Sequence, residues 1–282
     1  MIREFSFENE YADVWSLMSM PTDGTLLTDP SGLGFAVQNS YARIGNNFVR
    51  TQSLLSQGEI KGNIISKDYA IFRAFANYIA SSRSLKLRYR ALESDSWFYR
   101  DVDVTVLEKS EIQEEGHVLS CPITIKCKSL YYQDAVIRYV VSATELDRRY
   151  TIPYPNRYSD YALRKDTFTN DGHVDASISF EIDGYCENPR IQISDSSGDL
   201  YDITFPVTIQ QGERLDYSSL EGDTYILHID ANGNEQNIVG EMSLDNDNFV
   251  RLPPGSYEVK FSSDTGTTNR TMYALHKFYK VV

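Results

Sequence analysis

The residues that most often perform chemistry in proteins are spaced too widely here to form a recognisable site. No histidine belongs to an HExxH motif or lies near a cysteine at the spacing of zinc ligands. The sequence has no GxSxG nucleophile motif and no P-loop, and Ser31-Gly32-Leu33-Gly34 lacks the third glycine and the following helix of a dinucleotide site. We therefore expect no catalytic residues, no cofactor and no metal. The histidines are His117, His173, His228 and His276.

One segment has the spacing of a calcium-binding EF-hand loop. Its ligand positions would be Asp230, Asn232, Asn234 and Glu241. The position that requires glycine holds Glu235, however, and both flanks alternate as strands. Asn232-Gly233 is a preferred dipeptide of β-hairpin turns. The sequence therefore favours a hairpin, in which His228 alternates with Leu227 and Ile229 and faces solvent.

The three cysteines are too few and too far apart for a disulfide framework. Cys121 and Cys127 alternate onto one face of a predicted strand with Ile123 and Ile125. The strand residues between the two cysteines span about 20 Å, which is beyond the reach of a disulfide. Cys186 lies near a turn and has no nearby partner in sequence. We expect three buried thiols that behave as small apolar side chains.

Composition and charge exclude several functional classes. The chain has 282 residues, of which 41% are hydrophobic and 24% charged, as in ordinary globular proteins of about two domains. Its net charge of −13 disfavours binding to nucleic acid or to anionic lipid. No apolar run has the length of a membrane helix, and the N-terminus shows no secretory h-region. We expect neither a membrane partner nor sequence-specific binding of nucleic acid.

Charge and periodicity together predict two domains. Residues 1–142 contain 15 basic and 17 acidic residues, which gives a net charge of −2. Residues 143–282 contain 12 basic and 23 acidic residues, which gives −11. Residues 143–166 contain two prolines, several tyrosines and no regular period, which indicates a connector. We therefore expect one domain over 1–142, a connector over 143–166 and a second domain over 167–282.

The first half combines one helix with several strands. Asp68–Ala80 has a single apolar face, with Ser66 as the expected N-cap. Three segments alternate between apolar and polar residues, which indicates half-buried strands. They are Leu85–Arg90, Val102–Leu107 and Leu119–Cys127. Pro122 suggests that the last of these is an edge strand or contains a bulge.

The second half shows short strands separated by turn residues, which favours a β-sandwich or jelly roll. The predicted strands are Val174–Ile182, Arg190–Ser194, Tyr201–Ile209, Tyr225–Ile229, Gln236–Met242, Ser256–Phe261 and Met272–Tyr279. The chain also contains 20 tyrosines, 13 phenylalanines and two tryptophans. Tyrosine is common on strands and also in protein interfaces, and both interpretations stay open. Without a catalytic motif, the sequence favours an assembly protein over an enzyme.

The order of several segments resembles the distal tail proteins of siphophage baseplates with Gram-positive hosts. The resemblance covers most of residues 1–142 and fades after about Ile209. It rests on SGLG (31–34), GEIKGNIISKDYAIFRAFANYI (58–79), LKLRY (85–89), YRDVDVTVLEKSE (99–111), LSCPITIKCKSLYYQ (119–133), YPNRY (154–158) and GYCENPRIQI (184–193). No single motif among them is specific, but their order is informative.

The resemblance implies a mainly β fold: an N-terminal β-sandwich with one α-helix and an extended arm, and a C-terminal galectin-like or jelly-roll sandwich. It implies a hexameric ring that joins the tail tube protein to a tail-associated fibre-like protein and a receptor-binding protein, with DNA passing through. The location implied is the virion tail tip, after synthesis in the host cytoplasm. We expect the strand pair around Arg100–Gln113 to form the arm and its receiving face.

Two other functions stay open. The chain would be a carbohydrate-binding module for adhesion to the host surface if exposed aromatic side chains formed a platform for a saccharide. Tyr201, Tyr217 and Tyr225 are the candidates for that platform. A glycoside hydrolase would instead need a facing pair of carboxylates, which the sequence does not identify.

Overall fold

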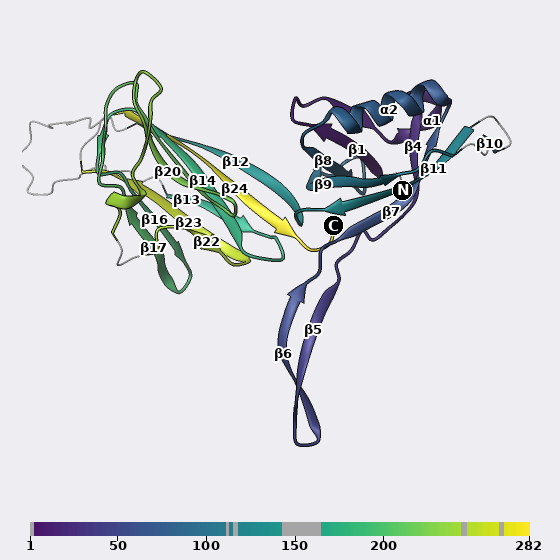
Figure 1. Ribbon diagram of the computed structural model, residues 1–282. Helices are drawn as coiled ribbons and strands as arrows, with labels where there is room; N and C mark the ends of the chain where they lie inside the picture. Colours follow the sequence, from purple (N-terminus) through teal and green to yellow (C-terminus); the bar gives the residue numbers. More distant parts are fainter. Residues whose placement is uncertain (1–2, 111–112, 115–117, 143–164, 244–246, 265–267) are drawn as a thin grey trace, which may run out of the picture. The chain divides into compact units, whose positions relative to one another are not determined.

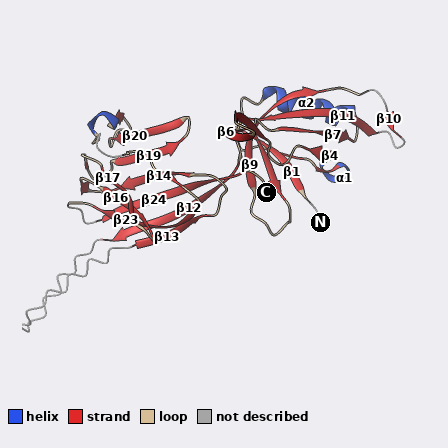
Figure 2. Ribbon diagram, turned by 90° about the horizontal axis from the view of Figure 1, so that it is seen from below, coloured by secondary structure: helices blue, strands red, loops and turns tan. Residues whose placement is uncertain are grey.

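The computed structural model describes residues 3–110, 113–114, 118–142, 165–243, 247–264 and 268–282. Strands dominate, and the chain divides into two compact units (Figure 1). Unit 1 contains residues 1–133 and 279–282, and unit 2 contains residues 134–278. The mainly β class is confirmed, and the helices α1 and α2 lie beside the strands of unit 1 (Figure 2).

The unit boundaries differ from those expected from sequence. The chain passes between the units within β12 (Tyr131–Ser142) and again at the end of β24 (Thr268–Tyr279), so residues 134–142 belong to unit 2 and residues 279–282 to unit 1. Of the expected connector, residues 143–164 lie outside the described residues, and the last two residues begin β13 (Lys165–Asn170). The connector therefore stays a prediction.

Unit 1 is built on antiparallel strands. Its elements are β1 (Glu4–Asn9), β2 (Val14–Ser16), β3 (Met18–Ser19), α1 (Met20–Asp23), β4 (Thr25–Ser31), β5 (Val37–Ile44), β6 (Asn47–Leu55), β7 (Glu59–Ser66), α2 (Tyr69–Ser81), β8 (Leu85–Arg90), β9 (Phe98–Leu107), β10 (Gln113–Glu114), β11 (Val118–Cys127) and the start of β12. The strands pair in the order β2-β1-β8-β9-β11-β7-β4-β3, while β5 pairs with β6. Leu17 links the β1 side of this order to the β4 side. Its N–H donates to the Phe5 carbonyl in β1, and its own carbonyl accepts from the Leu27 N–H in β4, each at 3.0 Å.

The alternation predicted for unit 1 is largely confirmed. Leu85, Leu87 and Tyr89 are buried, as are the five alternating residues of β11 from Leu119 to Cys127. In β9 a bulge at Thr105 shifts the alternation, so Val106 faces solvent and Leu107 packs on the core. Of the two alternatives suggested by Pro122, the edge strand is wrong, because β11 lies between β7 and β9, whereas the pairing of β11 with β9 does shift register between Thr124 and Ile125.

The predicted helix is present as α2, but its cap differs. Asp68 is the N-cap, and its Oδ1 accepts a hydrogen bond from the Ile71 N–H at 2.9 Å. Ser66 is fully buried within β7 instead. The apolar face of α2 places Phe75 in the core, where its ring centre lies 6.2 Å from that of Phe7 and 5.5 Å from that of Trp15.

Unit 2 is the predicted β-sandwich. Its remaining elements are β14 (Ala176–Asp183), β15 (Cys186–Glu187), β16 (Arg190–Asp195), β17 (Gly198–Thr204), β18 (Thr208–Ile209), β19 (Arg214–Leu220), β20 (Asp223–Ile229), β21 (Glu235–Asn237), the 3-10 helix η1 (Val239–Glu241), β22 (Arg251–Leu252) and β23 (Gly255–Ser262). One layer has the order β21-β20-β19-β14-β24-β12 and the other β13-β23-β16-β17. Apolar side chains of β14 and β16 fill one core between the layers.

Several strand predictions in unit 2 need correction. The predicted strand Tyr201–Ile209 is interrupted near Phe205 and Pro206, so it forms the last part of β17 and the whole of β18. The predicted strand Gln236–Met242 is a short strand followed by η1. The sequence reasoning missed β13 and β19, since serines and charged residues obscure their alternation.

Candidate assembly interface

The most exposed apolar surface of the described chain lies on the β5–β6 hairpin, Val37–Leu55, which we call the arm. Every residue of both strands is exposed, and Figure 1 shows the hairpin projecting away from the other unit 1 strands. Residues 35–55 hold eight of the sixteen exposed large apolar side chains among the described residues. They are Phe35, Val37, Tyr41, Ile44, Phe48, Val49, Leu54 and Leu55. Apolar surface concentrated in this way marks an interaction site.

The arm also differs from the rest of the chain in charge. Residues 30–57 contain no aspartate or glutamate, and their charged side chains are Arg43 and Arg50, which gives a net charge of +2. The whole chain carries −13, so the remainder carries −15. An acidic protein thus presents a cationic, apolar projection that is electrostatically suited to an acidic surface.

Gly32 and Gly58 flank the arm where it joins the rest of unit 1, and we call this junction the root of the arm. Gly32 has φ +84°, and a Cβ there would collide with the carbonyl oxygen of Glu59. A Cβ at Gly58 would collide with the guanidinium of Arg100. Gly32 therefore serves close backbone packing at the root of the arm, whereas a Cβ at Gly34 would meet no atom within 4 Å.

Arg100 is the buried cation at this root. It is 3% exposed, its Nε donates to the Ser129 carbonyl at 2.8 Å, and its guanidinium carbon lies 4.8 Å from the ring centre of Tyr131. Its Nη1 and the Tyr131 hydroxyl are both buried without a hydrogen-bond partner. Burial raises the pKa of Tyr131 to about 12, although Arg100 opposes that rise. The expectation that Arg100–Gln113 forms the arm is wrong, because β9 is paired on both sides within unit 1.

Comparison with known families identifies this part of the chain. Residues 4–128 match the family model described as distal tail protein, N-terminal domain. Residues 4–128 are a distal tail protein domain. The match includes the arm, its root and α2.

Solved structures extend the likeness in fold beyond the distal tail domain. A chain of the phage P2 baseplate in its activated conformation with Ca has a TM-score of 0.64 and 13% identity, with 100% of both chains covered. The SPP1 Dit protein, described as a paradigm of the hub adsorption apparatus in phages infecting Gram-positive hosts, has a TM-score of 0.62 and 12% identity, covering 96% of this chain and 98% of that one. No curated protein matches in sequence. In the described part of the chain, no helix is both long and apolar enough to span a membrane.

Outside the distal tail domain, the fold assembles a serine, a histidine and an aspartate that the sequence search did not detect. His276 Nε2 lies 3.1 Å from Ser179 Oγ, and its Nδ1 lies 2.6 Å from Asp134 Oδ1. Ser179 lies inside β14, however, which is paired with β19 on one side and β24 on the other. The adjacent Ile178 N–H is held by Ser219 at 3.0 Å. Without free backbone donors for an oxyanion, these residues form a cross-strand hydrogen-bond network.

Glu181 in β14 and Asp216 in β19 lie opposite each other, in surroundings that disfavour their charged forms. Burial, and then the charges of Asp183 and Asp216, raises the pKa of Glu181. Burial also raises the pKa of Asp216, with Asp183 contributing and Arg214 opposing, and Asp216 Oδ1 is buried without a partner. They form no metal site, since no group of three potential ligand residues that could hold a metal ion occurs in the described part of the chain.

The remaining candidates take structural positions. Tyr217 is buried and stacks on Phe180, so Tyr201, Tyr217 and Tyr225 do not form a platform. The Asn232-Gly233 hairpin is confirmed between β20 and β21, where Asp230 accepts from the N–H groups of Asn232 and Asn234. His228 is not solvent-facing as expected, since it is largely buried and lies 3.0 Å from Glu213. The three cysteines are free and buried, as predicted.

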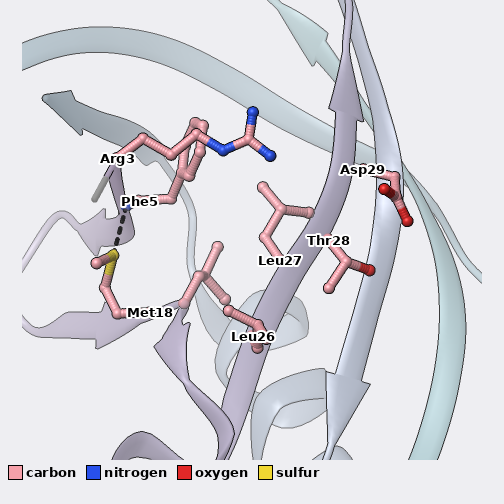
Figure 3. A pocket seen from close by; sticks show the side chains of 8 residues that line it. Arg3, Phe5, Met18, Leu26, Leu27, Thr28 and Asp29 are labelled. Atoms are coloured by element: carbon pink, nitrogen blue, oxygen red, sulfur yellow. Dashed lines mark hydrogen bonds between the residues drawn. The ribbon is translucent and has the colours of Figure 1, made fainter. Parts of the chain in front are cut away.

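A cavity of about 280 Å³ opens between β1, β3 and β4 of the distal tail domain (Figure 3). Leu26 and Leu27 line it, with Arg3 extending over one side and Asp29 at the other (Figure 3). The Phe5 N–H donates to Met18 Sδ at 3.1 Å beside it. The lining offers neither a histidine nor a thiol nor a pair of carboxylates, so it does not suggest a catalytic site.

Proposed function

We propose that this chain is the hub of a phage tail tip and assembles as a hexameric ring. The ring would join the tail tube protein to a tail-associated fibre-like protein and a receptor-binding protein. The proposal places the chain in the virion, at the tail tip, after synthesis in the host cytoplasm. The observation that carries it is the exposed arm within a distal tail protein domain.

The arm provides the physical reason for self-association. A two-stranded hairpin with its apolar side chains in water is marginally stable alone, and covering those side chains on a second subunit removes them from water. A ring closes when one patch repeatedly contacts a different patch through a fixed rotation. The arm and the acidic surface of the next copy form such an unlike pair.

A ring built on residues 1–142 would suit the passage of DNA. These residues carry a net charge of −2, so a bore lined by them would not retain the phosphate backbone. We assign unit 2 to contacts with the receptor-binding protein, with a host-surface saccharide as a further partner. The separate alternative of a carbohydrate-binding module lost its candidate platform when Tyr217 proved to be buried.

The test measures mass as a function of concentration. A hexamer has a mass of about 193 kDa, six times that of the 32.2 kDa chain. We expect light scattering to approach this mass at high concentration, and negative-stain images to show rings when the tube protein is present. A variant in which a short Gly-Ser turn replaces Val37–Leu55 should stay monomeric. A wild-type chain that stays monomeric in all these conditions and binds an oligosaccharide would overturn the hub proposal in favour of the carbohydrate-binding module.

A further inference from the structure

The arm has two faces, and the strand register separates their chemistry. Directly opposed residues of an antiparallel pair share a face. Face A consists of Val37, Asn39, Tyr41 and Arg43 with Phe48, Arg50, Ser53 and Leu55. Face B consists of Gln38, Ser40, Ala42 and Ile44 with Asn47, Val49, Gln52 and Leu54. Thr51 is the extra residue of a bulge, and the pairing resumes beyond it with the same division between faces.

Face A contains all the charge and all the aromatic side chains of the arm. Tyr41 lies opposite Arg50, and Arg43 lies opposite Phe48. The two aromatic side chains are 58% and 71% exposed, respectively. Aromatic and arginine side chains are the residues most enriched at the energetic centres of protein interfaces. Face A therefore fits an acidic protein surface, which the rest of this chain, at a net charge of −15, supplies in a second copy.

Face B has neither a charged nor an aromatic residue, and its apolar residues are aliphatic. Ile44 is 63% exposed, Val49 is 48% exposed and Leu54 is 54% exposed. Nucleic acid and anionic membranes are bound through cations, which face B lacks. A stacking surface for a sugar ring would need an aromatic side chain, which it also lacks. Face B therefore fits an uncharged apolar protein surface.

Outside its own arm, a second copy offers no matching surface for face B within its described residues. Its exposed large apolar side chains beyond residues 35–55 are scattered over separate elements. They are Tyr11, Val14, Tyr69, Leu92, Val106, Leu200, Met272 and Val281. A subunit that docks on face A would also leave the opposite side of the hairpin in water. Face B then requires a second, different occupant.

We propose that the arm is a two-sided docking element, with a different protein surface bound on each face. Face A binds the acidic surface of a second copy within the ring, and face B binds a different tail protein through an apolar, uncharged surface. This inference rests on the proposed ring and adds to it a division of labour between the two sides of one hairpin. The two interfaces should therefore be separable by substitution.

The experiment compares two variants of the full chain. Arg43→Glu/Arg50→Glu changes face A, and Ile44→Ser/Leu54→Ser changes face B. Controls are Asn39→Ser on face A and Gln38→Ser/Gln52→Ser on face B, which remove neither charge nor apolar side chains. Ring formation is followed by light scattering over a concentration series. Binding of the purified tail tube protein and of the purified tail-associated protein is measured separately for each variant.

We expect Arg43→Glu/Arg50→Glu to raise the concentration needed for ring formation by about tenfold or more. Ile44→Ser/Leu54→Ser should leave that concentration within about twofold and weaken binding of one of the two neighbouring proteins by about tenfold. Both controls should behave as wild type.

Three results would overturn the assignment of face B to a different protein. The ring could dissociate in Ile44→Ser/Leu54→Ser, both neighbouring proteins could bind that variant normally, or wild-type rings could pair through their arms and lose this pairing in the variant. If the wild-type chain never self-associates, the ring proposal and face A fail. Binding of the neighbouring proteins to the monomer then still decides face B.

Discussion

The guanidinium of Arg100 lies over the ring of Tyr131 inside unit 1, with 4.8 Å between the guanidinium carbon and the ring centre. Arginine remains charged at any ordinary pH, so the chain keeps a buried cation here. The aromatic ring and the Ser129 carbonyl compensate part of the desolvation cost, while Nη1 has no partner. Gly58 leaves the space in which this group fits, at the point where the arm joins β7.

Gly58→Ala should therefore destabilise unit 1. The new Cβ would overlap the Arg100 guanidinium, which is buried and has little room to move. We expect a loss of about 2 kcal/mol in the free energy of unfolding, measured by urea denaturation. Gly34→Ala is the matched control, because a Cβ there meets no atom within 4 Å. Equal stability of the two variants would refute the packing described for Arg100.

Asp68→Ala should weaken the start of α2. The Asp68 side chain accepts from the Ile71 N–H, and an uncapped N–H at this position costs about 1 kcal/mol. Asp68→Asn retains an acceptor and should lose much less, as thermal unfolding would show. An equal loss in both variants would mean that the charge of Asp68 matters, and not its hydrogen bond.

Thr271→Val should stabilise unit 2. Thr271 is 4% exposed, and its hydroxyl is buried without a partner beside the apolar side chains of Ile178 and Tyr273. Valine has nearly the same shape and removes the unsatisfied hydroxyl, so a gain of about 1 kcal/mol is expected in denaturant titration. Thr271→Ser keeps the hydroxyl and removes a methyl group, so it should lose stability. A destabilised valine variant would indicate that the hydroxyl has a partner, such as a water molecule.

Glu181 and Asp216 should reduce stability as pH rises. Their pKa values are higher in the folded chain than in the unfolded chain, so the folded state binds more protons between those values. Their contribution is therefore most favourable below the unfolded pKa and is lost as pH rises through the folded pKa. Glu181→Gln/Asp216→Asn should raise Tm at pH 7 by about 2 °C, and the difference from wild type should disappear near pH 3, which lies below both unfolded pKa values. A constant difference across this range would contradict the titration.

The connector remains to be tested by limited proteolysis. Residues 143–166 contain Pro153, Pro155 and several charged residues without a regular period, which predicts an extended and accessible segment. We expect the first cut between Thr144 and Phe168, located by mass spectrometry of the fragments. First cleavage within α2 or β11 would contradict this boundary.

The sequence by itself determined the elements whose burial follows a regular period. Leu85, Leu87 and Tyr89 alternate with charged residues, and the apolar face of Asp68–Ala80 repeats with the helical period. Both patterns can be recognised within a single segment, because each follows from the burial of one face of that segment. The ordered segments also sufficed to indicate the distal tail family. The arm has no such signal, since both of its faces are exposed and mix apolar with polar residues.

The tertiary structure decided what depends on pairing between distant segments. Asp134 and His276 are 142 residues apart and meet because β12 and β24 lie in the same layer of unit 2. The bulge that turns Val106 outward is defined by the partner strand β11, and the return of residues 279–282 to unit 1 depends on contacts with its core. Strand register and contacts between distant segments produce no periodic pattern in the sequence of either partner, because they depend on both partners together.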